Sequence, residues 1–165
     1  MKSHLFFVSF FCVFIFIAYV FYSSYGFIFF VKDQQLIKLT LKKSFFDQAQ
    51  KELLVEVVNT QDSIAKGLSL RKDLVSESGQ KINGLLFIFP MKEIRQFWMK
   101  DMLFNIDICW LDDLAFFSCE RQIQKPDFGK ELKIYRSPII SDLVLETAPD
   151  YFSNEELKLK LFFKW

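Results

Sequence analysis

Residues 106–120 read IDICWLDDLAFFSCE, and this stretch decides the fold class. Apolar side chains fill residues 106–111 and again residues 115–120, and each run has the length of a short strand. Asp112 and Asp113 separate the two runs. Aspartate is favoured in tight turns because its side chain bonds to the local backbone. The stretch therefore predicts a β-hairpin.

The hairpin carries Cys109 on its first strand and Cys119 on its second. If Asp112 and Asp113 form the turn, the two cysteines are offset along the ladder, beyond the ~7 Å between Cα atoms that a disulfide allows. A longer turn centred on Leu114 would place them opposite each other. The first turn predicts buried free thiols, and the second predicts a disulfide.

Similar patterns surround the hairpin. Strands are expected at residues 52–59, 85–89 (stopped by Pro90), 97–102, 143–145 and 157–161. Short helices are expected at residues 61–70, capped by Thr60, and from Pro149 through Glu155, with loops at residues 72–83 and 122–138. We therefore expect a mainly β (α+β) domain, built as a small barrel-like or strongly bent antiparallel sheet with two short helices.

The N-terminus has a different character, because residues 5–31 contain no charged side chain. Residues 5–22 are apolar except for Ser9, and as a helix they would span about 27 Å, close to the hydrocarbon thickness of a bilayer. Residues 24–26 offer a small-x-small cleavage site, so a signal peptide is the alternative. The apolar run resumes at residues 27–30, which favours an uncleaved transmembrane anchor.

These patterns divide the chain into an anchor or signal peptide at residues 1–31, a tether at residues 32–51 and a globular domain at residues 52–165. Within the tether, residues 36–41 have the pattern of an edge strand. The lysines after the anchor would keep the domain in the cytoplasm by the positive-inside rule, but long domains that follow a very short tail translocate largely regardless of charge. We expect a membrane-anchored domain outside the cytoplasm, or a secreted one if the N-terminus is cleaved.

The charges of the domain are balanced. The chain has 21 Lys and Arg and 20 Asp and Glu. Lys2 is the only charged residue before residue 32, so the rest of the chain carries 20 of each sign. Nucleic-acid binders normally show a basic excess, so we expect no nucleic-acid partner and a single, monomeric domain.

The residue types also limit the chemistry. The only histidine is His4, at the start of the apolar segment, so the domain has none for a Ser-His-Asp or Cys-His site. Zinc sites mostly need Cys or His, and only Cys109 and Cys119 are available in the domain. No phosphate-binding glycine motif is present. We therefore expect no metal, no cofactor and no catalytic residues of these classes.

Four residues are candidates for a binding site: Arg71, Trp98, Lys100 and Asp107. Asp107 lies between two isoleucines, and a carboxylate there needs cationic or N–H partners. Arg71 ends the predicted helix and can bind a carboxylate with two parallel bonds. We expect an Arg71–Asp107 ion pair that fixes the helix against the sheet. Trp98 is either core or a ligand platform.

Five motifs follow one another in a set order: Gly67-Leu68-Ser69-Leu70-Arg71, residues 84–89 (GLLFIF), Phe97-Trp98-Met99-Lys100, Ile106-Asp107-Ile108 and Leu143-Val144-Leu145-Glu146. In this order the chain resembles the DUF192 family, also called UPF0127, from about residue 55 to about residue 161. The family consists largely of exported or membrane-tethered prokaryotic proteins of unknown activity. The resemblance implies an extracytoplasmic domain and supplies no reaction.

The expected function is a non-enzymatic envelope domain. It would bind a partner protein, an envelope polymer or a small ligand through a groove near Trp98, Lys100 and Arg71. The alternative is a carboxylate-based hydrolase that acts on an envelope glycan or a related substrate, which needs two carboxyl groups facing one pocket. Asp101, Asp107 and Glu146 are among the side chains that would supply them.

Overall fold

The computed structural model describes residue 15 and residues 30–127 and 131–164. Lys32–Trp165 form one compact unit, and the fold is that of this unit. The predicted membrane segment lies almost entirely outside the described residues. Among the residues that are described, no helix is both long enough and apolar enough to cross a bilayer.

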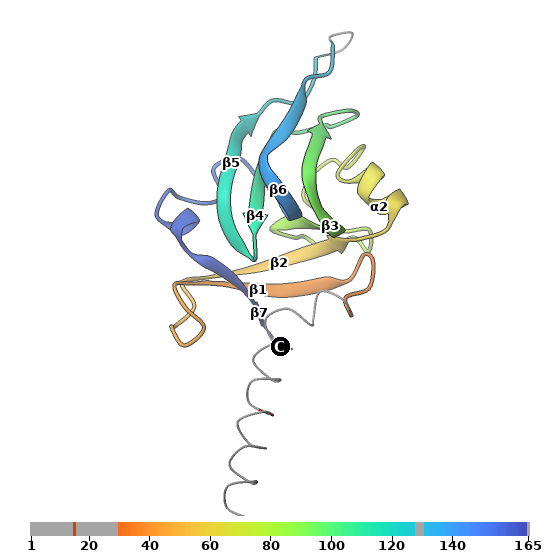
Figure 1. Cartoon of the computed structure of the whole chain (residues 1–165). Helices are drawn as coiled ribbons and strands as arrows, with labels where there is room; N and C mark the ends of the chain where they lie inside the picture. Colours follow the sequence, from red (N-terminus) through yellow and green to blue (C-terminus); the bar gives the residue numbers. More distant parts are fainter. Residues whose placement is uncertain (1–14, 16–29, 128–130, 165) are drawn as a thin grey trace, which may run out of the picture. The chain divides into compact units, whose positions relative to one another are not determined.

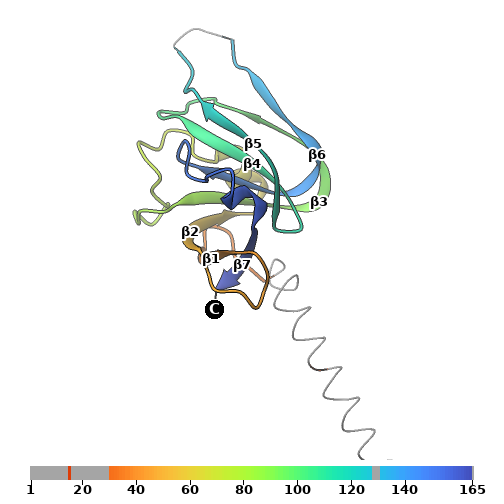
Figure 2. The same cartoon turned by 90° about the vertical axis from the view of Figure 1, so that its left-hand side faces the viewer.

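Seven strands make up the unit (Figures 1 and 2). They are β1 (Leu36–Lys42), β2 (Lys51–Val58), β3 (Gly84–Trp98), β4 (Ile106–Asp112), β5 (Ala115–Ile123), β6 (Ile134–Thr147) and β7 (Lys160–Lys164). The described helices are α2 (Gln61–Lys66) and a single 3-10 turn, η2 (Glu156–Lys158). The mainly β, strongly bent sheet predicted from the sequence is confirmed.

The strands are hydrogen-bonded in the order β1-β2-β3-β6-β4-β5-β7, and β7 pairs back onto β1. β1 therefore has a neighbour on each side, although its residues were expected to form an edge strand in a tether. Figure 1 shows β1 and β2 crossing beneath the strands β3, β4, β5 and β6.

Two expectations, one about the sheet and one about a helix, were wrong. The sheet is not wholly antiparallel, because β2 and β3 run parallel from the Val55–Gly84 pair to the Val58–Phe87 pair. A parallel neighbour requires a crossover connection, and α2 with the loop after it supplies one. The helix expected after Pro149 is also absent from the described residues there, and the nearest helical turn is η2.

β3 was expected to end at Pro90, and a separate strand was expected at residues 97–102. Instead β3 runs on to Trp98, because its pairing with β6 is interrupted between Ile88 and Glu93 and resumes beyond. Pro90 lies in that interruption, where no ladder N–H is needed. Pro138 of β6 lies in a second one, opposite Arg95. The two irregularities bend the β3–β6 ribbon.

The middle strands are buried on both faces. Phe87, Trp110 and Val144 belong to one apolar cluster, which also contains Leu68 from the segment after α2. Residues of the opposite parity on the same strands, including Leu86, Leu111 and Leu145, are buried as well. Strands that are covered twice read as continuous apolar runs, which explains the sequence pattern.

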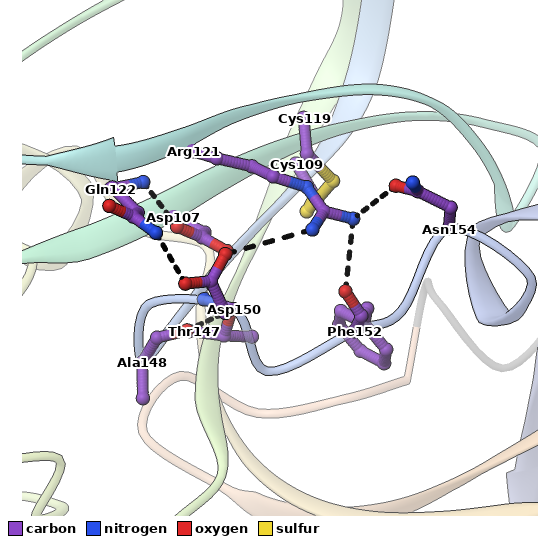
Figure 3. Close-up of a disulfide and its surroundings, with 10 residues drawn as sticks. All are labelled: Asp107, Cys109, Cys119, Arg121, Gln122, Thr147, Ala148, Asp150, Phe152 and Asn154. Atoms are coloured by element: carbon purple, nitrogen blue, oxygen red, sulfur yellow. Dashed lines mark hydrogen bonds and ion pairs between the residues drawn. A yellow bond between two sulfur atoms is a disulfide. The ribbon is translucent and has the colours of Figure 1, made fainter.

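The hairpin of β4 and β5 contains a disulfide between Cys109 and Cys119 (Figure 3). The turn is formed by Asp113 and Leu114, which both have positive φ, one residue later than expected. Phe117 is an extra residue in β5, between the Leu111–Phe116 and Trp110–Ser118 pairs. Together these two shifts place the cysteines opposite each other, so the disulfide alternative is confirmed and the buried free thiols that an Asp112-Asp113 turn predicts are not formed.

Candidate functional site

A groove lies between α2, with the segment after it, and the outer half of β3 (Glu93–Trp98), and Glu146 of β6 reaches into it. In Figure 1, α2 and β6 lie on opposite sides of β3. The groove has a volume of about 340 Å³. One wall is residues 64–69, from α2 and the segment after it, and the other wall is residues 94–98 of β3. Phe87, Phe89, Met102 and Glu146 complete the lining.

The α2 wall is built by local sequence. Thr60 and Ser63 form a capping box at the start of the helix, and Gly67 ends it with a φ of 49°. Beyond the helix, the Ser69 hydroxyl donates to the Lys100 carbonyl at 2.9 Å. The neighbouring backbone N–H of Leu70 donates to the Asp101 carbonyl at 2.8 Å. These bonds tie the α2 wall to the turn that follows β3 and hold the groove open at a fixed width.

Aromatic rings form the β3 wall and the floor. The ring centre of Phe97 lies 4.9 Å from that of Phe87 and 5.4 Å from that of Trp110, both in edge-to-face contact. The guanidinium of Arg95 lies 4.0 Å from the centre of the Phe89 ring. Trp98 is 56% exposed, which is unusual for so large an apolar side chain at the rim of a groove.

Glu146 lies at the base of the groove. It is only 5% exposed, and its Oε2 atom is buried without a hydrogen-bond partner. Gly84 of β3 approaches it closely, since a Cβ at that position would lie 2.5 Å from the Glu146 carbonyl oxygen. Burial raises the pKa of Glu146 to about 8, and the charge of Arg71 opposes that rise only in part. At neutral pH the side chain therefore presents a protonated carboxyl to the groove.

Arg71 lies behind this site, and its partner is not the one expected. Its guanidinium donates to Glu56 Oε2 at 2.5 Å, to the Val75 carbonyl at 2.7 Å and to Glu77 Oε1 at 3.0 Å. Glu56 is fully buried and also accepts a bond from the Glu77 backbone N–H. Arg71 thus holds the loop that follows α2 against β2. The predicted ion pair between Arg71 and Asp107 is wrong.

Asp107 is satisfied by backbone instead (Figure 3). Its two carboxylate oxygens accept the N–H groups of Gln122, at 2.7 Å, and Asp150, at 2.8 Å. Both donors have positive φ, so the carboxylate stabilises two strained positions at once. Burial raises the pKa of Asp107, and these two hydrogen bonds counteract the rise. Arg121 joins the network through Asp150, with 3.7 Å between Nη1 and Oδ1. These contacts tie β4 to β5 and to the segment that follows β6.

The four predicted site residues are therefore not all brought together. Trp98 lines the groove, and Lys100 is exposed just beyond it. Arg71 lies deeper and acts on Glu146 only through its charge. Asp107 belongs to the separate network around Arg121.

Two functional candidates were missed or underweighted, and both carry a readable signal. Glu56 interrupts the apolar run of residues 53–58, and Glu146 follows the apolar run of residues 143–145. A charged residue inside a buried strand must be paired or serve a site, which is the reasoning that selected Asp107. The same reasoning, applied to every strand, selects Glu56, Asp107 and Glu146.

The fold and this groove can now be compared with known proteins. A family profile described as DUF192, Uncharacterized ACR, matches residues 44–160. The chain belongs to the DUF192 family. No curated protein matches it.

Two solved structures are similar in fold to this chain. One is a protein of unknown function from Novosphingobium aromaticivorans, with 18% identity, a TM-score of 0.61, and coverage of 79% of this chain and 86% of that one. The other, from Sinorhizobium meliloti, is provisionally named a transcription regulator and has 16% identity and a TM-score of 0.62, with coverage of 81% and 97%. At these identities the likeness shows the fold alone.

Proposed function

We propose that this DUF192 chain is a non-enzymatic binding domain of the cell envelope, which takes a ligand into the groove beside β3. One observation carries the proposal. Glu146, almost fully buried, has an oxygen without a hydrogen-bond partner at the base of a groove lined with aromatic rings. A buried polar atom without a partner costs free energy, and a ligand that supplied the missing bond would recover it.

The lining suggests what such a ligand must offer. Rings and aliphatic side chains take an apolar body, and a protonated carboxyl pairs with a group that has an acceptor oxygen, such as an amide or an acid. The envelope location is supported by the Cys109–Cys119 disulfide, since disulfides persist in oxidising compartments, and by the uncharged residues 5–31. We take the domain to be membrane-anchored and outside the cytoplasm.

The hydrolase alternative is less well supported by this groove. Hydrolysis of a glycan needs two carboxyl groups on either side of the scissile bond. Glu146 is the single acidic side chain among the described residues that line the groove. Asp107 and Asp101, the other carboxylates considered, do not line it.

A fragment screen tests the proposal. The full-length chain is titrated with a library of small amides and carboxylic acids, and binding is followed by ligand-detected NMR and by tryptophan fluorescence, to which the exposed Trp98 contributes. We expect hits that compete with one another and that lose their affinity in Glu146→Leu. Glu120→Gln, an exposed change on β5, is the matched control and should leave the hits intact. Hits that are scattered over the surface and indifferent to Glu146→Leu would refute a binding groove.

A further inference from the structure

The groove is bordered by an unpaired strand edge. β2 pairs with β3 only from Gly84 to Phe87, and the chain then turns away into α2. Farther along, β3 pairs with β6 from Glu93 to Trp98. Among the described strands, none pairs with the other edge of this outer half of β3.

The orientation of that edge follows from one hydrogen bond. The backbone N–H of Arg95 donates to the Ser137 hydroxyl of β6. Successive N–H groups of a strand point to opposite edges, so those of Ile94, Gln96 and Trp98 point away from β6. Five consecutive residues, 94–98, line the groove, so side chains of both parities border it and the free edge of β3 is open to it, while Phe87, Phe89 and Glu146 lie beneath.

The charged side chains in and near the groove indicate what kind of peptide could bind along this edge. Lys66 and Arg95 line the groove, and each has a carboxylate partner, Glu77 at 2.8 Å and Glu93 at 3.3 Å. Lys100 is exposed just after β3, and Arg136 is exposed on β6, opposite Gln96 in the register. Within the described residues neither Lys100 nor Arg136 forms an ion pair. Two apolar side chains of β3 are also exposed here, Ile94 at 44% and Trp98 at 56%.

We propose that the outer edge of β3 binds an extended acidic peptide as an added strand. Its backbone would pair with Ile94, Gln96 and Trp98. Because side chains alternate between the two faces of a strand, its apolar side chains would enter the groove beside Phe97, and its carboxylates would lie on the other face, toward Lys100 and Arg136. A peptide carbonyl would meet the carboxyl of Glu146. Added strands gain affinity from main-chain bonds and specificity from alternate side chains. The inference rests on the proposed binding groove and names its ligand class.

The test uses the full-length chain and a blocked heptapeptide of alternating valine and glutamate. A matched peptide carries one N-methyl group on each of its two edges, which removes backbone donors and keeps the side chains. We expect the parent peptide to change the tryptophan fluorescence of the chain, to which the exposed Trp98 contributes. The N-methylated peptide should bind up to about tenfold more weakly, since a lost hydrogen bond costs about 0.5–1.5 kcal/mol. A valine–lysine peptide should also bind more weakly, because its charge is wrong.

A pair of variants tests the protein side. Gln96→Pro removes one donor from the free edge, a position at which proline is tolerated in edge strands, and Gln96→Ala keeps the donor. Binding should fall in Gln96→Pro and persist in Gln96→Ala, with both melting as the wild type does. The N-methyl comparison stands even if Gln96→Pro does not fold.

Equal binding of the parent and N-methylated peptides would overturn the added strand. Absence of peptide binding, together with fragment hits that depend on Glu146, would overturn it too while leaving the binding groove in place. Failure of both fragments and peptides would remove the proposed function itself.

Discussion

Glu146 couples the stability of the domain to pH. Its pKa is raised by burial from 4.5 to about 8, so between these values the folded chain holds a proton that the unfolded chain has released. Unfolding then releases a proton, and stability falls as the pH rises through this window, by at most about 1.4 kcal/mol per pH unit. Below the unfolded pKa both states are protonated, and above about pH 8 the dependence ends.

The measurement is a series of denaturant titrations from pH 5 to pH 8. We expect Glu146→Gln to remove the part of the decline that Glu146 causes, so that the variant gains stability relative to the wild type as pH rises. Glu120→Gln, on the exposed surface of β5, should follow the wild type. Parallel curves for Glu146→Gln and the wild type would mean that Glu146 is ionised in the folded protein.

The Arg71–Glu56 pair gives a second prediction at this scale. Glu56 is fully buried and the Arg71 side chain is 11% exposed, so removing Arg71 leaves the Glu56 charge buried without a cation, and removing Glu56 leaves Arg71 only the partly exposed Glu77 as an ion-pair partner. Arg71→Met or Glu56→Leu should each cost about 3–5 kcal/mol of stability, and the double variant should recover part of that loss. Urea denaturation of the three variants checks this. Strict additivity of the two losses would show that the groups do not interact.

Among the elements, the β4–β5 hairpin depends most visibly on a covalent bond. The disulfide joins cysteines separated by 10 residues, and closing a loop of that size stabilises by about 2–3 kcal/mol in the chain-entropy view. A reducing agent should therefore lower the melting temperature of the wild type. Cys109→Ala with Cys119→Ala should melt near the reduced wild type and should not respond to the reductant. An unchanged wild type under full reduction would contradict a stabilising role.

The strands also show how much of the fold can be predicted from the sequence. Strands β2 and β4 were predicted to within a residue or so, because their apolar runs are bounded by turn residues. β3 and β6 were cut short, because Pro90 and Pro138 normally end strands and nothing local announces that the pairing is interrupted there and then resumes. For a similar reason the sequence did not decide between a disulfide and free thiols. The one extra residue at Phe117 sets the register of the hairpin and has no signature in the composition.

The candidate site was predictable only in part. Trp98 was selected because of its place in a recognisable motif, and it does line the groove. The groove itself depends on where β2 leaves β3, which is a matter of topology and not of local pattern. Glu146 had a local signal, but its unpartnered oxygen is a property of the packing around it.

At the scale of the whole molecule, the uncharged residues 5–31 predict attachment to a membrane. The full-length protein should remain in the membrane fraction after a high-salt wash, because apolar insertion is not screened by ions. Deleting residues 1–31 should release it. Release of the full-length protein by salt alone would exclude an integral anchor, and a mature N-terminus near residues 24–26 would identify a cleaved signal.

The pairing of β1 with β7 has a consequence for how the chain matures. The hydroxyl of Thr40 bonds to the carbonyl of Phe162, 122 residues away along the chain, and the Lys38–Lys164 pair spans even more. Contacts so distant form slowly, because a long loop must close before they give any stabilisation. Until β7 emerges from the ribosome or the translocation channel, β1 and β5 remain open edges that can pair with other chains. The nascent domain thus passes through an aggregation-prone interval in which a holding chaperone would be most useful.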